Sequence, residues 1–488
     1  MRCGVRGHSA PNPSQAAALL FNSYSFVFLF LPAAWSIYWL LRRAVAGSLA
    51  IGFLIAASLF FYGWWHPSYV LLLLGSMAVN YGLCRAIAAS RNRALLAIGV
   101  CLNLCVLGYF KYASFLAETV NALAGSPIFG IAPLVLPLAI SFYTFQQIAF
   151  LVDVGRGRVP LPSPLHYVAA VTFFPHLIAG PIVQYREMLP QFETLRRRGP
   201  SAEECAIGLG LFAAGLFKKL WLADPCGEIA NPVFGAPSGA AVSKTDAWVG
   251  TLAYTAQLYF DFSAYSDMAL GLAHMLGLVL PINFNSPYQS QSIIDFWRRW
   301  HMTLSGFLRD YLYVPLGGSR KGPIRRHLNL LITMALGGLW HGAGWTFVFW
   351  GLLHGLYLSV NHLWRAAGLR MHSSIAWPLT LLAVVLAWVP FRSATMERAI
   401  DLYRAMLLPG SSGVPSLVDG RSLLVLAAAL GVALWCPNAV SLARSSSIGP
   451  WLAARRWRPA LTGIAIATLL AASILKLGSA SEFLYFNF

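Results

Sequence analysis

Charged residues are scarce in this chain. Asp, Glu, Lys and Arg make up 11% of its 488 residues, whereas hydrophobic residues make up 58%. A soluble domain carries about 25% charged residues, so this chain has too few charges to cover a globular surface. Crossing a bilayer takes roughly 20 mostly apolar residues. The chain has several apolar runs that reach or approach this length: 25–41, 48–64, 95–110, 421–436 and 460–477. It is therefore predicted to be an all-α, polytopic membrane protein with about ten to thirteen membrane segments, some re-entrant.

Acidic residues are scarcer than basic ones. The chain has 17 Asp and Glu against 35 Lys and Arg, and its net charge is +18. Such a balance can indicate nucleic-acid binding, but here the basic residues form short clusters between apolar runs, for example at 42–43, 196–198 and 320–326. That pattern is typical of the positive-inside rule of membrane proteins. We therefore expect membrane lipids, and no nucleic acid, as partners.

Metal-like cysteine patterns and long polar segments are also lacking. The 7 cysteines show no Cys–His spacing typical of a metal site, so we expect no metal. No polar break reaches the roughly 40 residues that an independent soluble domain needs. We predict one membrane domain over residues 21–482, an N-terminal extension over 1–20, and an aromatic tail over 483–488. The extension is either disordered or the product of an upstream start codon that is not used.

Polar residues concentrate in the middle of the chain. Residues 133–360 are rich in Gly, Pro, His, Gln, Asn and Asp, whereas the flanking regions are plain apolar spans. Polar groups at membrane depth are costly and usually mark function. An enzyme, a transporter with a His and Asp proton relay, and a structural membrane subunit are the alternatives, although so dense a polar region argues against the last of these.

His341 is the main candidate for chemistry. The apolar stretch 328–340 ends in a Gly-rich break at 337–344, and a second apolar run follows at 345–360. If the first run enters the membrane and the second returns, His341 lies inside it, where irregular backbone must be buried in protein or line a cavity. A neutral imidazole there can act as a general base, with Trp340 and Trp345 as apolar walls. A continuous span, or a histidine bonded to a neighbouring helix, is the alternative.

Residues 295–318 predict an amphipathic helix at the membrane interface. Arg309 and Asp310 lie off its apolar face, and the basic residues of that other face would meet headgroups or an anionic ligand; a plain surface helix is the alternative. His301 lies on the buried face and is a candidate to act beside His341. The buried stripe at helical spacing comprises Trp297, Trp300, His301, Leu304, Phe307, Leu308 and Tyr311.

Three further polar stretches contribute candidates. Asp261 and Asp267 lie in an apolar segment, where a buried carboxylate needs a partner; we expect nearby arginines, and a structural ion pair is the favoured interpretation. Tyr143 and Gln146 either line a polar path or form hydrogen bonds between helices. His176 follows Pro175 in a segment that predicts a structural kink.

Several motifs occur together in a specific order. They are F-N-S-Y-S-F-V-F-L-F-L-P (21–32), P-L-A-I-S-F-Y-T-F-Q (137–146), F-F-P-H-L-I-A-G-P-I (173–182), Y-F-D-F-S-A-Y-S-D-M-A-L-G (259–271), N-F-N-S-P-Y (283–288), the W-R-R-W-H stretch and G-L-W-H-G-A-G-W (338–345). With them the chain, from about Phe21 to Phe488, resembles the membrane-bound O-acyltransferases, and among them the AlgI-like alginate and exopolysaccharide O-acetyltransferases. The N-terminal extension departs from the family pattern.

The resemblance implies the fold and a role for each histidine. His341 matches the invariant histidine of the family. His301 matches a second motif position, which is often Asn or Asp in other branches and His in the AlgI-like branch. It implies a multi-pass protein of the bacterial inner membrane that passes acetyl groups from a cytoplasmic donor, acetyl-CoA, to a periplasmic or membrane-anchored acetyltransferase partner that O-acetylates a polysaccharide. No bound cofactor is implied. D-alanine transfer of the DltB type is an alternative. We interpret the tail, which would otherwise expose its aromatic rings, as a docking segment.

Overall fold

The computed structural model describes residues 19–44, 47–131, 134–195, 200–408, 418–444, 458–479, 481, 483 and 484. Of the predicted extension only residues 19–20 are among them, and the basic cluster at 196–198 and the tail beyond residue 484 lie outside them. Within these ranges every regular element is a helix, which confirms the all-α prediction.

The helices follow one another with short connections. The first half of the chain forms η1 (Ser25–Phe30), α1 (Leu31–Ala44), α2 (Gly47–Gly63), α3 (Pro67–Ser90), α4 (Arg93–Leu107), η2 (Gly108–Tyr112), α5 (Ala113–Ala124), α6 (Ile140–Gly155), α7 (Pro164–Thr172), α8 (Phe174–Leu177), α9 (Tyr185–Leu195), α10 (Ala202–Phe217), η3 (Lys218–Ala223) and α11 (Asp224–Gly235). The second half forms α12 (Lys244–Met275), η4 (Pro287–Gln289), α13 (Ile293–Arg299), α14 (Met302–Leu308), η5 (Arg309–Tyr313), α15 (Pro323–His341), α16 (Trp345–Ala366), α17 (Ser373–Arg392), α18 (Met396–Leu407), α19 (Gly420–Trp435), α20 (Ala439–Arg444), α22 (Arg458–Lys476) and η6 (Leu477–Ser479).

The multi-pass prediction is confirmed. Among the described residues, six helical segments are long and apolar enough to cross a membrane, and two shorter apolar helices accompany them. In the polar central region only Ala202–Gly235 belongs to this group, while α6, α12, α15 and α16 fall outside it. The six segments are Ser25–Arg43, Pro67–Ser90, Arg93–Ala124, Ala202–Gly235, Ser373–Arg392 and Ala460–Ser479.

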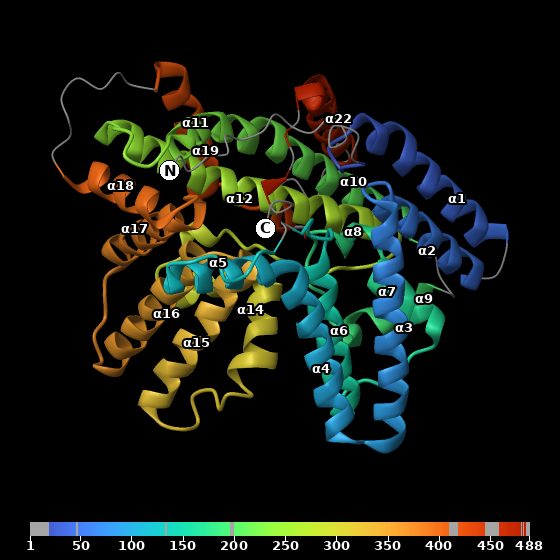
Figure 1. Cartoon of the computed structure of the whole chain (residues 1–488). Helices are drawn as coiled ribbons and strands as arrows, with labels where there is room; N and C mark the ends of the chain where they lie inside the picture. The colour runs from blue at the N-terminus through green and yellow to red at the C-terminus, as the bar shows by residue number, and fades with distance from the viewer. Residues whose placement is uncertain are drawn as a thin grey trace.

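Helix α12 is the centre of the fold. It has 32 residues, which is about 48 Å at 1.5 Å per residue, and nearly all of them are buried. It begins at Ser243, whose hydroxyl accepts a hydrogen bond from the Asp246 N–H, a typical N-cap. Helices α10 and α11 pack along it. In Figure 1 it crosses the middle of the molecule, while α3 with α4 and α15 with α16 extend from it towards the lower edge of the view.

Helices α15 and α16 form the predicted hairpin. They are joined by residues 342–344 alone and pack against each other along their length. Glycines make the close packing possible, because a Cβ atom at Gly338 would overlap the carbonyl oxygen of Phe347, and one at Gly351 would overlap that of Met334. Small residues at such a contact are typical of membrane helix pairs. The turn after His341 rules out a continuous span, and α15 begins at Pro323, earlier than the predicted residue 328.

Filling this contact should loosen the hairpin. We expect Gly351→Ala to destabilise the protein by about 1–3 kcal/mol, because a methyl group forced into a packed contact strains both backbones. Thermal unfolding in detergent measures the effect. The control is Gly431→Ala in α19, where an added Cβ meets nothing within 4 Å. Equal unfolding temperatures for the two variants would contradict this packing.

The prediction of one continuous helix over 295–318 is wrong. The chain forms α13, then an extended Trp300 and a left-handed His301 (φ 42°), and only then α14 and η5. The break arises because the backbone pairs with an earlier segment: the Asn285 N–H donates to the Arg299 carbonyl at 2.9 Å, and the Met302 N–H donates to the Asn283 carbonyl at 3.0 Å. The stripe residues are still largely buried, so the apolar pattern could not reveal the break.

Candidate active site

His341 is the last residue of α15 and lies inside the protein. Its side chain is 3% exposed. Three aromatic rings surround it, with centroids 5.0 Å (Trp340), 5.2 Å (Trp350) and 5.3 Å (Phe391) from the imidazole. These rings come from α15, α16 and α17, so the hairpin and the next helix together enclose the histidine. Such an environment excludes water from any chemistry at the ring.

The structure brings His301 next to His341, as the sequence predicts. The two ring centroids are 6.3 Å apart, and His301 is completely buried. The α13–α14 break turns its ring towards the hairpin, and the ring of Phe262 from α12 packs edge-on against it at 4.7 Å. Two histidines from distant segments therefore share one aromatic pocket.

Asn283 fixes the orientation of His301. Its Oδ1 atom lies 3.0 Å from Nδ1 of His301 and accepts a hydrogen bond from the Thr303 hydroxyl at 3.0 Å. The Thr303 backbone N–H also points to this atom, at 3.4 Å. A backbone N–H can only donate, so the atom is the amide oxygen and Nδ1 of His301 carries the proton. The neutral ring then has its acceptor at Nε2.

Lys111 and Tyr112 hold the end of α15. In η2, the Lys111 ammonium donates to the Trp340 carbonyl and to the Ser141 hydroxyl, and the Tyr112 hydroxyl donates to the Leu339 carbonyl at 2.9 Å. Carbonyls at a helix C-terminus lack helical partners, and a cation there is favourable. The sequence reasoning missed Lys111. A lone lysine after the apolar run 95–110 was the available signal.

A third buried histidine, His354, lies behind the pair. Its Nδ1 accepts a hydrogen bond from the Trp297 indole at 3.2 Å, and its ring is 4.9 Å from that of Trp350, which also contacts His341. The sequence reasoning missed this residue as well, although a histidine in the apolar run 345–360 is itself unusual. His354 supports the wall of the pocket from α16.

Of the three tryptophans predicted to lie at the site, two are buried and one is exposed. Trp340 lies between the two histidines, 6.1 Å from His301 by ring centroids. Trp300 is buried in an aromatic cluster, 5.1 Å from both Phe284 and Trp388. Trp345 is 57% exposed and packs on Phe115. Its predicted role as a wall beside His341 is wrong, because it begins α16 after the turn with a largely exposed ring, and the wall on this helix is formed by Trp350 instead.

Tyr143 and Gln146 lie on α6, whose Phe142 and Phe145 pack on Trp340. Tyr143 and Gln146 are both buried. The Gln146 amide lies 3.2 Å from Nδ1 of His176, whose Nε2 lies 3.0 Å from the Ala170 carbonyl. These contacts tie α6 to α7 and α8, which favours hydrogen bonding between helices for Gln146 and the structural interpretation of His176. The Tyr143 hydroxyl is buried and has no hydrogen-bond partner among the described residues, so its two predicted alternatives stay open.

Arg309 and Asp310 are separate from the histidine pair. They form an ion pair with each other at 2.7 Å, and Asp310 lies 4.0 Å from Arg186. The Arg309 side chain is 66% exposed. Their position on η5 at the surface favours the interpretation of this segment as part of a membrane-surface helix.

The buried carboxylates of α12 pair with lysines. Asp261 contacts Lys219 and Asp267 contacts Lys218, each at 2.7 Å. The expectation of arginine partners is wrong, because η3 lies against this face of α12 and presents its two lysines there. Lys219 also contacts Asp224 at 2.9 Å. The ion-pair interpretation is thus the one that fits both aspartates.

Ser481 and the first two residues of the aromatic tail, Phe483 and Leu484, pack on this charged group. The Ser481 hydroxyl lies 2.6 Å from Asp224 and 3.0 Å from Lys219, and the Leu484 N–H donates to Asp261 at 2.9 Å. Phe483 is 1% exposed and packs on Tyr265. The docking interpretation assumed that the tail's rings would otherwise be exposed, whereas the chain itself buries the ring of Phe483.

The site is therefore a pair of buried imidazoles within an aromatic enclosure. Among the described residues, no group of three or more His, Cys, Asp or Glu is placed to hold a metal ion. Two adjacent imidazoles shielded from water can accept, hold and return a proton from a hydroxyl or thiol.

Comparison with known proteins identifies the family of this chain. The sequence profile of the membrane-bound O-acyltransferase family matches residues 85–389, which include both histidines. The "Probable alginate O-acetylase AlgI" of Pseudomonas aeruginosa is 43% identical, over 80% of this chain and 76% of its own length. The "Peptidoglycan O-acetyltransferase" of Helicobacter pylori is 41% identical, over 81% of each chain. The "Teichoic acid D-alanyltransferase" of Streptococcus thermophilus is 26% identical, over 46% of this chain and 57% of its own. The chain thus belongs to the membrane-bound O-acyltransferase family and is a multi-pass membrane O-acyltransferase.

Proposed function

We propose that this protein passes acetyl groups from a cytoplasmic donor, acetyl-CoA, across the bacterial inner membrane towards O-acetylation of an extracellular, alginate-like polysaccharide. The observation that carries the proposal is the buried pair of His301 and His341 in one water-excluding pocket. The relatives named for alginate and peptidoglycan O-acetylation support acetyl as the group and an envelope polymer as the destination. A periplasmic or membrane-anchored acetyltransferase would complete the transfer.

His341 would act as the general base. It takes the proton from the accepting hydroxyl or thiol, whose oxygen or sulfur attacks the carbonyl carbon of the acetyl thioester. The new bond to that carbon forms, the carbon–sulfur bond breaks, and the imidazolium returns the proton to the leaving thiolate. His301, held by Asn283, orients the acceptor through its Nε2. The surrounding aromatic rings keep water from hydrolysing the thioester.

Two indole N–H groups beside His341 are suited to the developing negative charge. Nε1 of Trp340 and Nε1 of Trp350 are buried and have no hydrogen-bond partner among the residues that the structure describes. Buried donors are nearly always paired, so such groups need an explanation. A substrate carbonyl oxygen would supply the missing acceptor, and donors already in place at that oxygen lower the barrier to acyl transfer.

This role can be tested without removing an aromatic ring. Trp340→Phe keeps the ring packing and loses the N–H, and we expect kcat to fall by about tenfold to a hundredfold. Trp345→Phe, on the exposed ring of the same hairpin, is the matched control and should retain wild-type kcat. Rates are measured as acetyl transfer by purified protein. Equal rates for the two variants would remove Trp340 from the mechanism.

Donor and acceptor chemistry test the proposal as a whole. Membranes containing the protein are incubated with labelled acetyl-CoA and O-deacetylated alginate, together with the partner acetyltransferase. Label should enter the polymer as an alkali-labile ester. Transfer only from a D-alanyl thioester would favour the D-alanine alternative, and movement of a solute without any acyl product would favour a transporter; either result would refute the proposal.

A further inference from the structure

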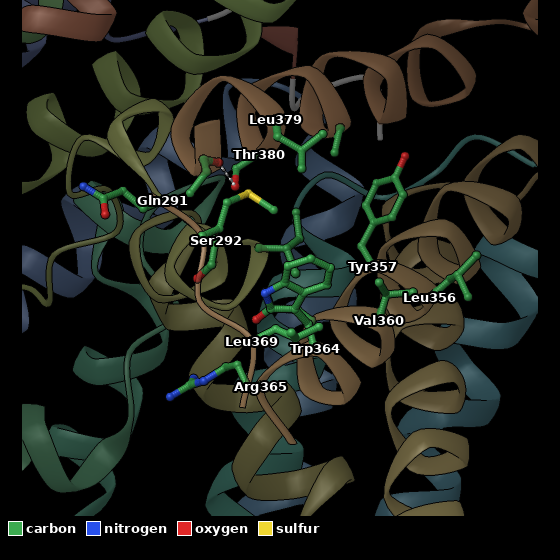
Figure 2. Close-up of a pocket in the computed structure, with 15 residues that line it drawn as sticks. Gln291, Ser292, Leu356, Tyr357, Val360, Trp364, Arg365, Leu369, Leu379 and Thr380 are labelled. Carbon is green, nitrogen blue, oxygen red and sulfur yellow. Dashed lines mark hydrogen bonds between the residues drawn. The ribbon is translucent and has the colours of Figure 1, made fainter. Parts of the chain in front are cut away.

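A cavity of about 650 Å³ lies between α16 and α17. It is lined by other residues of α16 than Trp350, which packs against His341. Figure 2 shows it bounded by Leu356, Val360 and Trp364 of α16, by Leu379 and Thr380 of α17, and by the chain at Gln291 and Ser292. Its volume is in the range of roughly 300–1,000 Å³ that small-molecule sites occupy. It is distinct from the histidine pair and has no part in the proposed mechanism.

The cavity has an apolar end that opens outwards. Leu356 and Val360 on α16, and Leu379 on α17, are each about half exposed, at 52%, 52% and 51%. Apolar side chains are more stable in hydrocarbon than in water. On the outer face of a membrane protein, exposed leucine and valine therefore contact the hydrocarbon chains of the bilayer. The apolar end is therefore accessible from the lipid.

The other end is polar and positively charged. Arg365 lines it beside Trp364, and none of the lining residues is acidic. The Asn361 amide oxygen at this end is buried, and no described residue forms a hydrogen bond with it. His362, the residue after Asn361, is within electrostatic reach of Arg365 and of Arg326 on α15. Tryptophan and arginine together are typical of the level where lipid headgroups lie.

The two ends are spaced like the parts of a phospholipid. Arg365 and Leu356 are nine residues apart on α16, which is about 13 Å along the helix axis. A headgroup phosphate at Arg365 would place an acyl chain along Leu356, Val360 and Leu379. The charge pattern also places Arg365 on the cytoplasmic side, with the 320–326 cluster, where the leaflet is rich in anionic lipids.

We propose that this cavity is a binding site for one anionic phospholipid, with its phosphate at Arg365, a headgroup hydroxyl at Asn361 and an acyl chain between α16 and α17. Basic pockets between helices on the cytoplasmic side recognise such headgroups. Tyr357, which lines the cavity, packs its ring against that of His354, and His354 in turn contacts Trp350. The lipid would thus buttress the outer layer of the aromatic wall that encloses His341.

Native mass spectrometry of the delipidated full chain in detergent tests this site. Phosphatidylglycerol and phosphatidylcholine with identical acyl chains are titrated separately. Wild-type protein should retain one phosphatidylglycerol in preference to phosphatidylcholine. Arg365→Gln should weaken phosphatidylglycerol binding about tenfold, as expected for loss of a charged hydrogen bond. Arg370→Gln, an exposed arginine that does not line the cavity, should change it by no more than about twofold.

A second variant separates headgroup from chain. Ala383 lines the apolar part of the cavity, and Ala383→Phe should weaken binding of phosphatidylglycerol without altering any charge. Thermal unfolding in lipid-free detergent verifies that each variant is folded. Equal phosphatidylglycerol affinity for wild type, Arg365→Gln and Ala383→Phe would overturn the proposal. So would competition by coenzyme A that depends on Arg365, since it would assign the cavity to a soluble phosphate ligand.

Discussion

Replacing His341 with glutamine should lower the rate of acyl transfer by about 10²–10⁴-fold, the contribution typical of general acid–base catalysis. Glutamine can fill the space between Trp340, Trp350 and Phe391 and can form hydrogen bonds, but it cannot take a proton at neutral pH. The loss should therefore fall on kcat, with the KM for the donor much less affected. Single-turnover and steady-state rates with labelled acetyl-CoA measure it.

Two further variants test whether the loss of activity is specific to the pair of His301 and His341. His176→Gln also places a glutamine at a buried histidine, but outside the pair, so it should cost at most about tenfold even if it lowers the unfolding temperature. His301→Gln combined with His341→Gln should lose little more than His341→Gln alone, because residues that act as a unit are not additive. A His341→Gln enzyme within threefold of wild type would contradict the assignment.

Replacing Lys219 with methionine should destabilise the protein by about 3–5 kcal/mol, the cost of leaving a buried charge without its partner. The Lys219 and Asp261 side chains are each 1% exposed, so water cannot replace the lost contact. Methionine keeps most of the side-chain volume. Because Lys219 also contacts Ser481, the variant should loosen the C-terminal segment, which protease accessibility of that segment would show alongside thermal unfolding in detergent.

A double variant can show whether Lys219→Met loses stability through the unpaired buried charge or through a packing defect. Adding Asp261→Asn to Lys219→Met removes the unpaired carboxylate yet keeps an oxygen for the Leu484 N–H, so the double variant should recover part of the loss. Lys244→Met, at the exposed start of α12, is the matched control and should be nearly neutral. If the double variant were less stable than Lys219→Met, the buried charge would not be the cause.

Much of the fold was predictable because the bilayer imposes a strong pattern on sequence. The scarcity of charge and the apolar runs predict a polytopic helical protein correctly. The Gly-rich sequence around His341 predicts the α15–α16 hairpin, since a chain that turns inside a membrane needs small residues and a protein environment. The proximity of His301 to His341 was predicted from the apolar face of the former and the family motifs.

Features set by long-range contacts were not predictable in the same way. The break at Trp300 and His301 depends on pairing with Asn283 and Asn285, which periodicity within 295–318 cannot show. The lysine partners of Asp261 and Asp267 come from η3, more than forty residues away in sequence. Lys111 was overlooked because its importance lies in the carbonyl of Trp340, which it meets only in the fold.

The most direct test of the account uses sealed vesicles that contain only this protein, with labelled acetyl-CoA supplied on the face that is cytoplasmic in the cell and the partner acetyltransferase on the opposite face. Wild-type protein should place labelled acetyl groups on the partner or its polymer across the membrane, while free coenzyme A appears on the donor side. Vesicles with His341→Gln should do neither above background. Acetylation by that variant at the wild-type rate, or wild-type vesicles that release no coenzyme A and acetylate nothing, would contradict the account.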